Sequence, residues 1–182
     1  MKLFYLLVFL IVLSSCSKTS EFAVQTASIF VFPTEFAQPA DNSSTIIPDT
    51  IVLTDTVATN FAYSFQANQT TAGNVKQILV ENVTLSIINN SFGNSFDHFK
   101  TITVAMSNAE ATDVIIATFS SSVVPTTIPI GVTTLQASSG ANAAAFINSD
   151  SYQLKVTAIV DTIPFDMQIQ ANVAFYVKAK TD

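Results

Sequence analysis

The sequence has no arginine, no tryptophan and a single cysteine, Cys16, in its 182 residues. Without arginine the chain has no planar, bidentate group for holding a carboxylate or phosphate ligand. One cysteine cannot form an intramolecular disulfide, and together with one histidine it supplies no cluster of transition-metal ligands. The sequence therefore predicts no cofactor and no metal centre of the zinc or copper type.

Charge is also scarce, because charged residues are only 11% of the chain against a typical quarter. Thirteen acids face seven lysines, which gives a formal net charge of −6. Nucleic acid is not an expected partner, since neutralising phosphates requires clustered basic residues. The same balance argues against electrostatic binding to an anionic lipid surface. The 49% hydrophobic content is too high for a disordered chain.

The N-terminus holds the longest apolar run, from Leu3 to Leu13, directly after Lys2. A helix needs roughly 20 apolar residues to cross a bilayer, so this run is too short to span one. A basic residue followed by a short apolar run and small residues is typical of a secretory signal peptide.

The residues that end this run, Leu13-Ser14-Ser15-Cys16, resemble the lipobox of bacterial lipoproteins. The resemblance implies that residues 1–15 are a cleaved signal peptide and that Cys16 carries acyl chains of the palmitate type as the first mature residue. Two or more acyl chains are enough for stable membrane attachment. Ser17, where an aspartate would favour the inner membrane, favours the outer membrane. The alternative is an ordinary secretory signal with an incidental cysteine.

Residues 16–49 are predicted to be the lipidated N-terminus and a tether, interrupted by prolines and by one strand at Ile29–Phe32. Residues 50–182 are predicted to be the folded domain. Apolar and polar residues alternate over 51–66, 75–88 and 102–106, which is typical of half-buried strands. We expect Val114–Phe119 to be a strand buried on both faces, and Pro129 to place residues 126–136 at a sheet edge.

The clearest alternation lies near the C-terminus, over residues 152–160 and again over 165–179. With turn residues at 161–164 between them, these segments predict a terminal β-hairpin. One short helix is expected within residues 137–150, where alanines gather. The predicted fold class is all-β: an antiparallel β-sandwich, Ig-like or jelly-roll-like, with one short helix and a preceding signal helix.

Few residues suggest chemistry. His98 follows Asp97, but adjacent residues on a helical turn do not face one another, so the aspartate is poorly placed to orient a general base. Two acid pairs could serve glycoside hydrolysis, and loop oxygens could hold calcium, although no EF-hand spacing is present. The acid pairs are Asp161 with Asp166 and Glu110 with Asp113. We assign none of these residues to catalysis or to a metal site.

The sequence thus predicts a lipid-anchored protein of the bacterial cell envelope. Its partners are expected to be the membrane, through the lipid on Cys16, and a protein or glycan bound by a non-catalytic β-sandwich. Two alternatives remain. One is a glycan hydrolase that uses a carboxylate pair, and the other is a self-assembling surface or pilus-type subunit in which Ile29–Phe32 adds to a neighbour's sheet.

Overall fold

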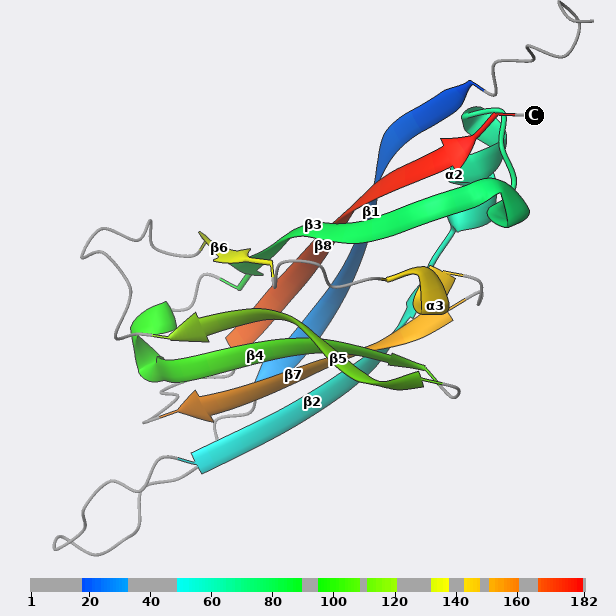
Figure 1. Ribbon diagram of the computed structural model, residues 1–182. Helices are drawn as coiled ribbons and strands as arrows, with labels where there is room; N and C mark the ends of the chain where they lie inside the picture. The colour runs from blue at the N-terminus through cyan, green and yellow to red at the C-terminus, as the bar shows by residue number, and fades with distance from the viewer. Residues whose placement is uncertain are drawn as a thin grey trace, which may run out of the picture.

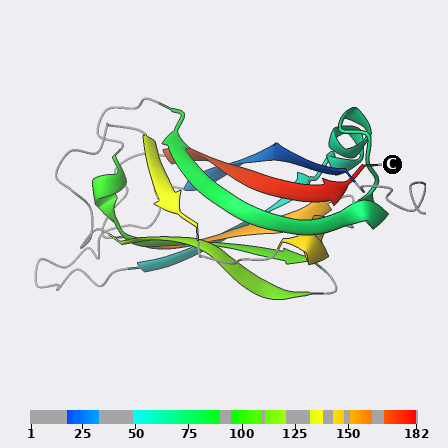
Figure 2. The ribbon, with the colours of Figure 1, turned by 45° about the horizontal axis from the view of Figure 1, so that its top comes forward.

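The computed structural model describes residues 18–32, 49–89, 95–108, 111–120, 132–137, 143–147, 151–160 and 167–181. They form two four-stranded antiparallel sheets packed face to face, which confirms the predicted β-sandwich (Figures 1 and 2). In order across the first sheet, A, the strands are β1 (Thr19–Phe32), β8 (Met167–Lys180), β3 (Val75–Ile87) and β6 (Val132–Gln136). In the second sheet, B, they are β2 (Asp49–Ala58), β7 (Ser151–Val160), β4 (Phe99–Asn108) and β5 (Ala111–Ser120).

The core lies between the sheets and is built from alternate residues of each strand. On β7 and β8 one row of side chains is buried and most of the other row is half-buried, as period-two alternation predicts. Aromatic rings connect the sheets: Phe32 of β1 meets Phe99 of β4 at 5.4 Å, and Tyr152 of β7 meets Phe175 of β8 at 6.3 Å between ring centroids.

The predicted C-terminal hairpin is wrong, because β7 and β8 belong to different sheets. β7 pairs with β2 and β4, whereas β8 pairs with β1 and β3. Alternation reports which face of a strand is buried but not which strand lies beside it. Since the inner faces of both sheets point into one core, a strand pair that changes sheets has the same pattern as a hairpin.

The expected strand over residues 51–66 is also partly wrong. β2 ends at Ala58, and Phe61–Ala67 forms a helix, α2, after Asn60 adopts a left-handed backbone with φ 49°. Phe61 and Phe65 are buried one helical turn apart, while Tyr63 points outward and is 77% exposed. Phe61, Tyr63 and Phe65 therefore have the spacing of one strand face, although only Phe61 and Phe65 share a helix face.

β1 confirms the expected strand at Ile29–Phe32 and its edge position, but it begins at Thr19, much earlier than predicted. It pairs along its whole length with β8, from Thr19↔Lys180 to Phe32↔Met167. The segment predicted as a tether thus contributes a long strand of the sandwich. Only a few residues separate Cys16 from the folded domain.

Two further predictions concern the second sheet and the short helix. β5 is not buried on both faces, because it is an edge strand on which Ile115 is 53% exposed. α3 (Ala144–Ile147) lies inside the predicted helical segment 137–150. Two single-turn 3₁₀ helices, η1 (Ala72–Asn74) and η2 (Phe96–His98), lead into β3 and β4.

Phe61→Ala tests the packing of α2. Phe61 is 1% exposed, stacks on Phe65 at 5.9 Å and meets Phe175 edge-on at 5.6 Å. Its truncation is expected to lower the free energy of unfolding by about 3–5 kcal/mol, measured by urea denaturation. The control Tyr63→Ala should change it by less than about 0.5 kcal/mol. Equal losses in both variants would contradict the helix and favour a strand with three residues on one face.

Candidate functional site

Of the acids and the cysteine singled out in the sequence, Cys16, Glu110, Asp161 and Asp166 lie outside the described residues. Asp97, His98 and Asp113 are described, and the structure does not bring them together. Asp97 and His98 lie just before the start of β4, whereas Asp113 lies beside its other end, because its neighbour Val114 pairs with Met106. Within the described ranges, no three histidine, cysteine or acidic side chains gather as metal ligands would.

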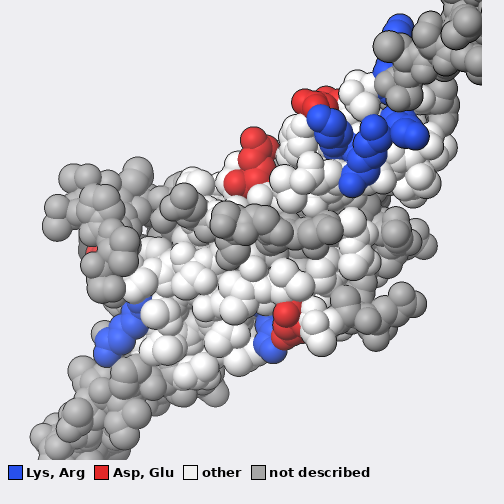
Figure 3. All heavy atoms as spheres, viewed as in Figure 1, with Lys and Arg blue, Asp and Glu red and all other residues white. Residues whose placement is uncertain are grey.

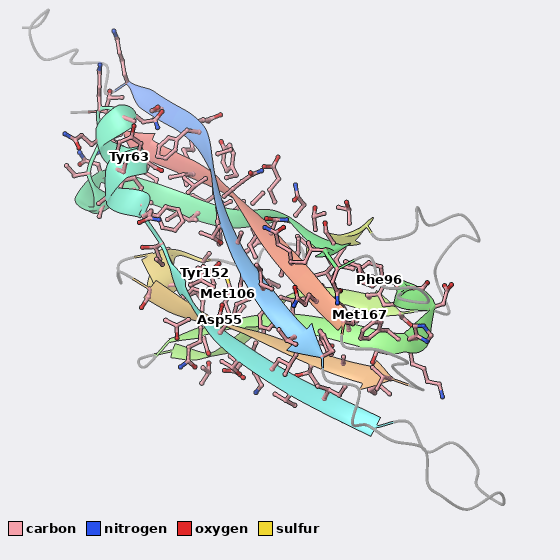
Figure 4. The ribbon with its side chains drawn as sticks, turned by 180° about the vertical axis from the view of Figure 1, so that it is seen from behind. Asp55, Tyr63, Phe96, Met106, Tyr152 and Met167 are labelled. Atoms are coloured by element: carbon pink, nitrogen blue, oxygen red, sulfur yellow. The ribbon has the colours of Figure 1, made fainter. Side chains whose placement is uncertain are left out.

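Asp97 and His98 belong to η2, which closes one end of the core. The Ser95 hydroxyl accepts a hydrogen bond from the Asp97 backbone N–H at 3.2 Å and donates one to Asp97 Oδ2 at 3.0 Å. Phe96, which Figure 4 labels, is 3% exposed, and its ring packs near those of Phe99 and Phe119. Residues 95–99 predict one helical turn with Asn94 or Ser95 as its cap, and the structure confirms the turn with Ser95 as the cap. The Asp97 carboxylate accepts a hydrogen bond from the capping hydroxyl of Ser95, which gives this segment a structural role.

Asp113 forms an exposed ion pair across sheet B. Lys155 Nζ lies 3.0 Å from Asp113 Oδ2, and both side chains are more than a third exposed. Exposed pairs of this kind contribute about 0–1 kcal/mol to stability. The pair gives Asp113 a local partner on the surface rather than a place in a cleft.

A polar seam joins the edge strand β1 to sheet B, and we define it as Thr26, Ser28, Asp55 and Tyr152. Thr26 Oγ1 and the Tyr152 hydroxyl share a buried hydrogen bond of 2.5 Å, and Ser28 Oγ donates to Asp55 Oδ2. Burial raises the pKa of Tyr152 to about 12. The alternation of β1 contained a signal for this seam, since Thr26 and Ser28 lie on the same parity as the core residues Val24 and Phe30.

The most distinctive surface is at the opposite end from η2. We call it the lysine end and define it as Lys18, Lys76, Lys178 and Lys180. Strand register places them together: Thr19 pairs with Lys180, and Lys76 lies in a bulge between Val75, opposite Ala179, and Gln77, opposite Lys178. Lys18, Lys76 and Lys180 are exposed. Figure 3 shows basic side chains gathered at the end where Figure 1 draws α2 and the C-terminus.

One acid offsets this charge among the described residues of the lysine end. Glu21 Oε1 lies 2.7 Å from Lys178 Nζ. The hydrogen bond from Lys178 lowers the pKa of Glu21, and the same contact raises the pKa of Lys178. In the described part of the chain, the other three lysines of this end have no ion-pair partner.

α2 covers the core at the lysine end and is tied to the strand ends there. Phe65 packs edge-on against Phe22 of β1 at 6.2 Å, and Thr70 Oγ1 donates to the Lys180 carbonyl at 2.5 Å. A shallow pocket of about 520 Å³ opens beside the helix. It is lined by Ala62, Phe65, Gln66, Gln69, Thr70, Thr71 and Ala72. No charged side chain lines it, so its chemistry suits an apolar or neutral group.

Comparison with known proteins assigns no family. The sequence matches no protein-family model, and no curated protein matches it. One solved structure that matches the chain is described as the crystal structure of the decameric BFDV capsid protein. It shares 8% identity and a TM-score of 0.40 over 88% of this chain and 100% of that chain. A likeness at this level does not carry a function from one protein to the other.

The described helices are all short. None of them has the length and apolar character needed to cross a bilayer.

The variant Tyr152→Phe tests the polar seam through its pH dependence. Near neutral pH it is expected to cost about 1 kcal/mol, since Thr26 loses a buried hydrogen bond. Above about pH 10 the unfolded state releases the tyrosine proton, whereas the folded state keeps it until about pH 12. Wild-type stability from this group is therefore complete below pH 10 and is lost towards pH 12, by about 2–3 kcal/mol.

The phenylalanine variant lacks this proton, so its deficit of about 1 kcal/mol should close as the pH rises above 10, and by about pH 12 the variant should be the more stable protein by about 1–2 kcal/mol. Urea unfolding of both proteins across this range measures the difference and cancels contributions from the other tyrosines and lysines. A deficit that stays constant over the whole range would contradict a buried, neutral Tyr152.

Proposed function

We propose that this protein is a lipid-anchored protein of the bacterial cell envelope, held at a membrane by acyl chains on Cys16. The observation that carries the proposal is the sequence Leu13-Ser14-Ser15-Cys16 after a short apolar run that is too short to span a bilayer. Ser17, in place of an aspartate, favours the outer membrane. Under this proposal residues 1–15 are removed and the sandwich begins almost directly after the anchor.

We further propose that the sandwich binds a protein or a polymer without catalysing a reaction. The carboxylates of Asp97 and Asp113 each have a local structural partner, Ser95 and Lys155, and they lie near opposite ends of β4. These two acids are therefore poorly placed for glycoside hydrolysis, which needs carboxyl groups within about 10 Å in one cleft. A self-assembling subunit is disfavoured because Ile29–Phe32, the segment that would be donated, already pairs with β8.

The outer face of β1 is the favoured partner surface. Ile29 and Val31 are 53% and 50% exposed on this edge strand, and both lie at the end of β1 remote from Cys16. Apolar side chains exposed next to one another on an open sheet edge are typical of surfaces that bind a partner.

Cys16→Ala tests the anchor. In a bacterial host the wild-type chain is expected to incorporate labelled palmitate, to lose residues 1–15 and to sediment with membranes. Cys16→Ala should incorporate no label and should accumulate as an uncleaved precursor, which intact-mass spectrometry distinguishes. Ser17→Asp is the matched control: it should keep the label and change only the membrane in which the protein is found. Normal cleavage of Cys16→Ala would contradict the proposal and indicate an ordinary secretory signal.

Photocrosslinking from the intact envelope tests partner binding. A photoreactive residue at Ile29 on β1 is expected to capture a partner, whereas one at Ile115 on β5, 53% exposed on the other sheet, should not. Capture from neither position, together with turnover of a cell-wall glycan by the purified protein, would overturn the non-catalytic assignment.

A further inference from the structure

The position of the first strand restricts how an anchored domain can be oriented. The Thr181 backbone N–H and hydroxyl both donate to the Lys18 carbonyl, at 3.0 and 3.1 Å, so Lys18 is held against the end of β8. Cys16 lies two residues earlier. Two residues span at most about 7 Å in any conformation. A lipid on Cys16 would therefore keep the lysine end close to the membrane surface.

The charge of this end is opposite to that of the chain as a whole. Four of the seven lysines gather here although the net charge is −6. Among the described residues of the lysine end, the one acid is Glu21, and it is already paired with Lys178. Asp182 follows Thr181 in the sequence, and its carboxylate lowers the net positive charge of the lysine end. An anionic lipid surface would attract the lysine end and repel the acidic remainder, which favours one orientation of the domain.

Tyr63 adds a second feature that suits a lipid interface. It is 77% exposed on α2, the helix that packs over the lysine end through Phe65 and Phe22. Figure 4 shows Tyr63 at the outer side of this helix, away from the core. Tyrosine has an apolar ring and a polar hydroxyl, and it is enriched at the headgroup level of membranes for that reason.

We propose that the lysine end and Tyr63 dock on anionic phospholipid headgroups of the membrane that holds Cys16. This inference rests on the proposed anchor, and it reverses the expectation drawn from net charge. Lysines near an anionic surface each strengthen binding by about fivefold, so three exposed lysines cannot recruit the domain by themselves. They can orient it, because a tethered domain meets the surface at high effective concentration.

The docked orientation leaves the other end of the sandwich free. Val31 lies twelve residues along β1 from Thr19, at about 3.3 Å per residue, which places it about 40 Å from the lysine end. Ile29, Val31 and η2 would then face away from the membrane.

Tryptophan fluorescence tests this orientation directly, because the sequence contains no tryptophan. The chain from Cys16 onward keeps all of the described strands, and its only cysteine allows coupling to a maleimide lipid. The anchor is thus supplied chemically, whether or not cells lipidate the protein. Two variants are compared: Tyr63→Trp, the α2 reporter, and Val31→Trp, the β1 reporter. Each is first shown to unfold like wild type in urea.

In vesicles of brominated phosphatidylglycerol and phosphatidylcholine, the α2 reporter is expected to be quenched and the β1 reporter is not. Quenching of the α2 reporter should weaken in pure phosphatidylcholine and at high salt. In the lipid-anchored protein, Lys76→Gln with Lys180→Gln should lower the quenching of the α2 reporter to its level in pure phosphatidylcholine. The matched pair Lys100→Gln with Lys155→Gln, which removes the same charge elsewhere, should leave the quenching of the α2 reporter unchanged.

Equal quenching of both reporters, or no quenching of the α2 reporter, would overturn the proposal. So would quenching of the α2 reporter that does not depend on lipid charge, salt or the lysine replacements, since it would indicate simple proximity to the anchor. Failure of the proposed lipidation would be a separate result. Protein from cells would then carry no palmitate on Cys16, whereas the chemically anchored protein would still dock as described.

Discussion

The structure depends on burying the inner faces of two sheets against each other. With one cysteine in the sequence, the fold has no disulfide to restrict its unfolded state, and charge is too scarce to organise it. β8 is central to this packing, because it pairs with β1 on one side and β3 on the other, and its inner row is almost fully buried. Phenylalanine and tyrosine rings from both sheets, from α2 and from α3 build the core. The largest fully buried members are Tyr152, Phe32, Phe61, Phe99, Phe146 and Phe175.

Contacts between the two sheets also cover the core beside the edge strands. β1 is long and lies at the edge of sheet A, where an unpaired backbone invites aggregation. Its inner row changes from core residues to Thr26 and Ser28, which hydrogen-bond to Tyr152 and Asp55 of sheet B. On the other side, a bridge between Ala117 and Ala137 connects β5 to the chain just after β6. Polar contacts and a backbone bridge thus close the two open sides of an otherwise apolar core.

The functional proposals follow from where the chain enters this sandwich. A long tether would have let the domain take any orientation, but β1 begins at Thr19 and its start is held by Thr181. The strand register then gathers lysines from β3, β8 and the residue before β1 at that same end. A chain that is acidic overall can therefore present a basic end to a membrane. Net charge describes the whole molecule, whereas docking depends on the charge of one surface.

The sequence by itself determined the fold class and the approximate strands, and it predicts the anchor. These depend on local information: the period of apolar residues, turn composition, and the short run that ends in Cys16. It also predicted the η2 turn with Asn94 or Ser95 as its cap, and both features involve neighbouring residues only. Which strands are neighbours could not be predicted, because β7 and β8 share a core and hence a pattern while lying in different sheets.

Tertiary structure alone decided the helix at Phe61–Ala67, the polar seam and the lysine end. Phe61 and Phe65 fit a strand and a helix equally well, and only their packing against Phe175 and Phe22 selects the helix. Thr26 and Tyr152 are 126 positions apart, and Lys18 and Lys180 lie near opposite ends of the chain. The alternation of β1 indicates that Thr26 and Ser28 face inward, but no local pattern identifies the distant residues that they contact. These contacts exist only once strand pairing has brought those residues to the same end or the same edge of the sandwich.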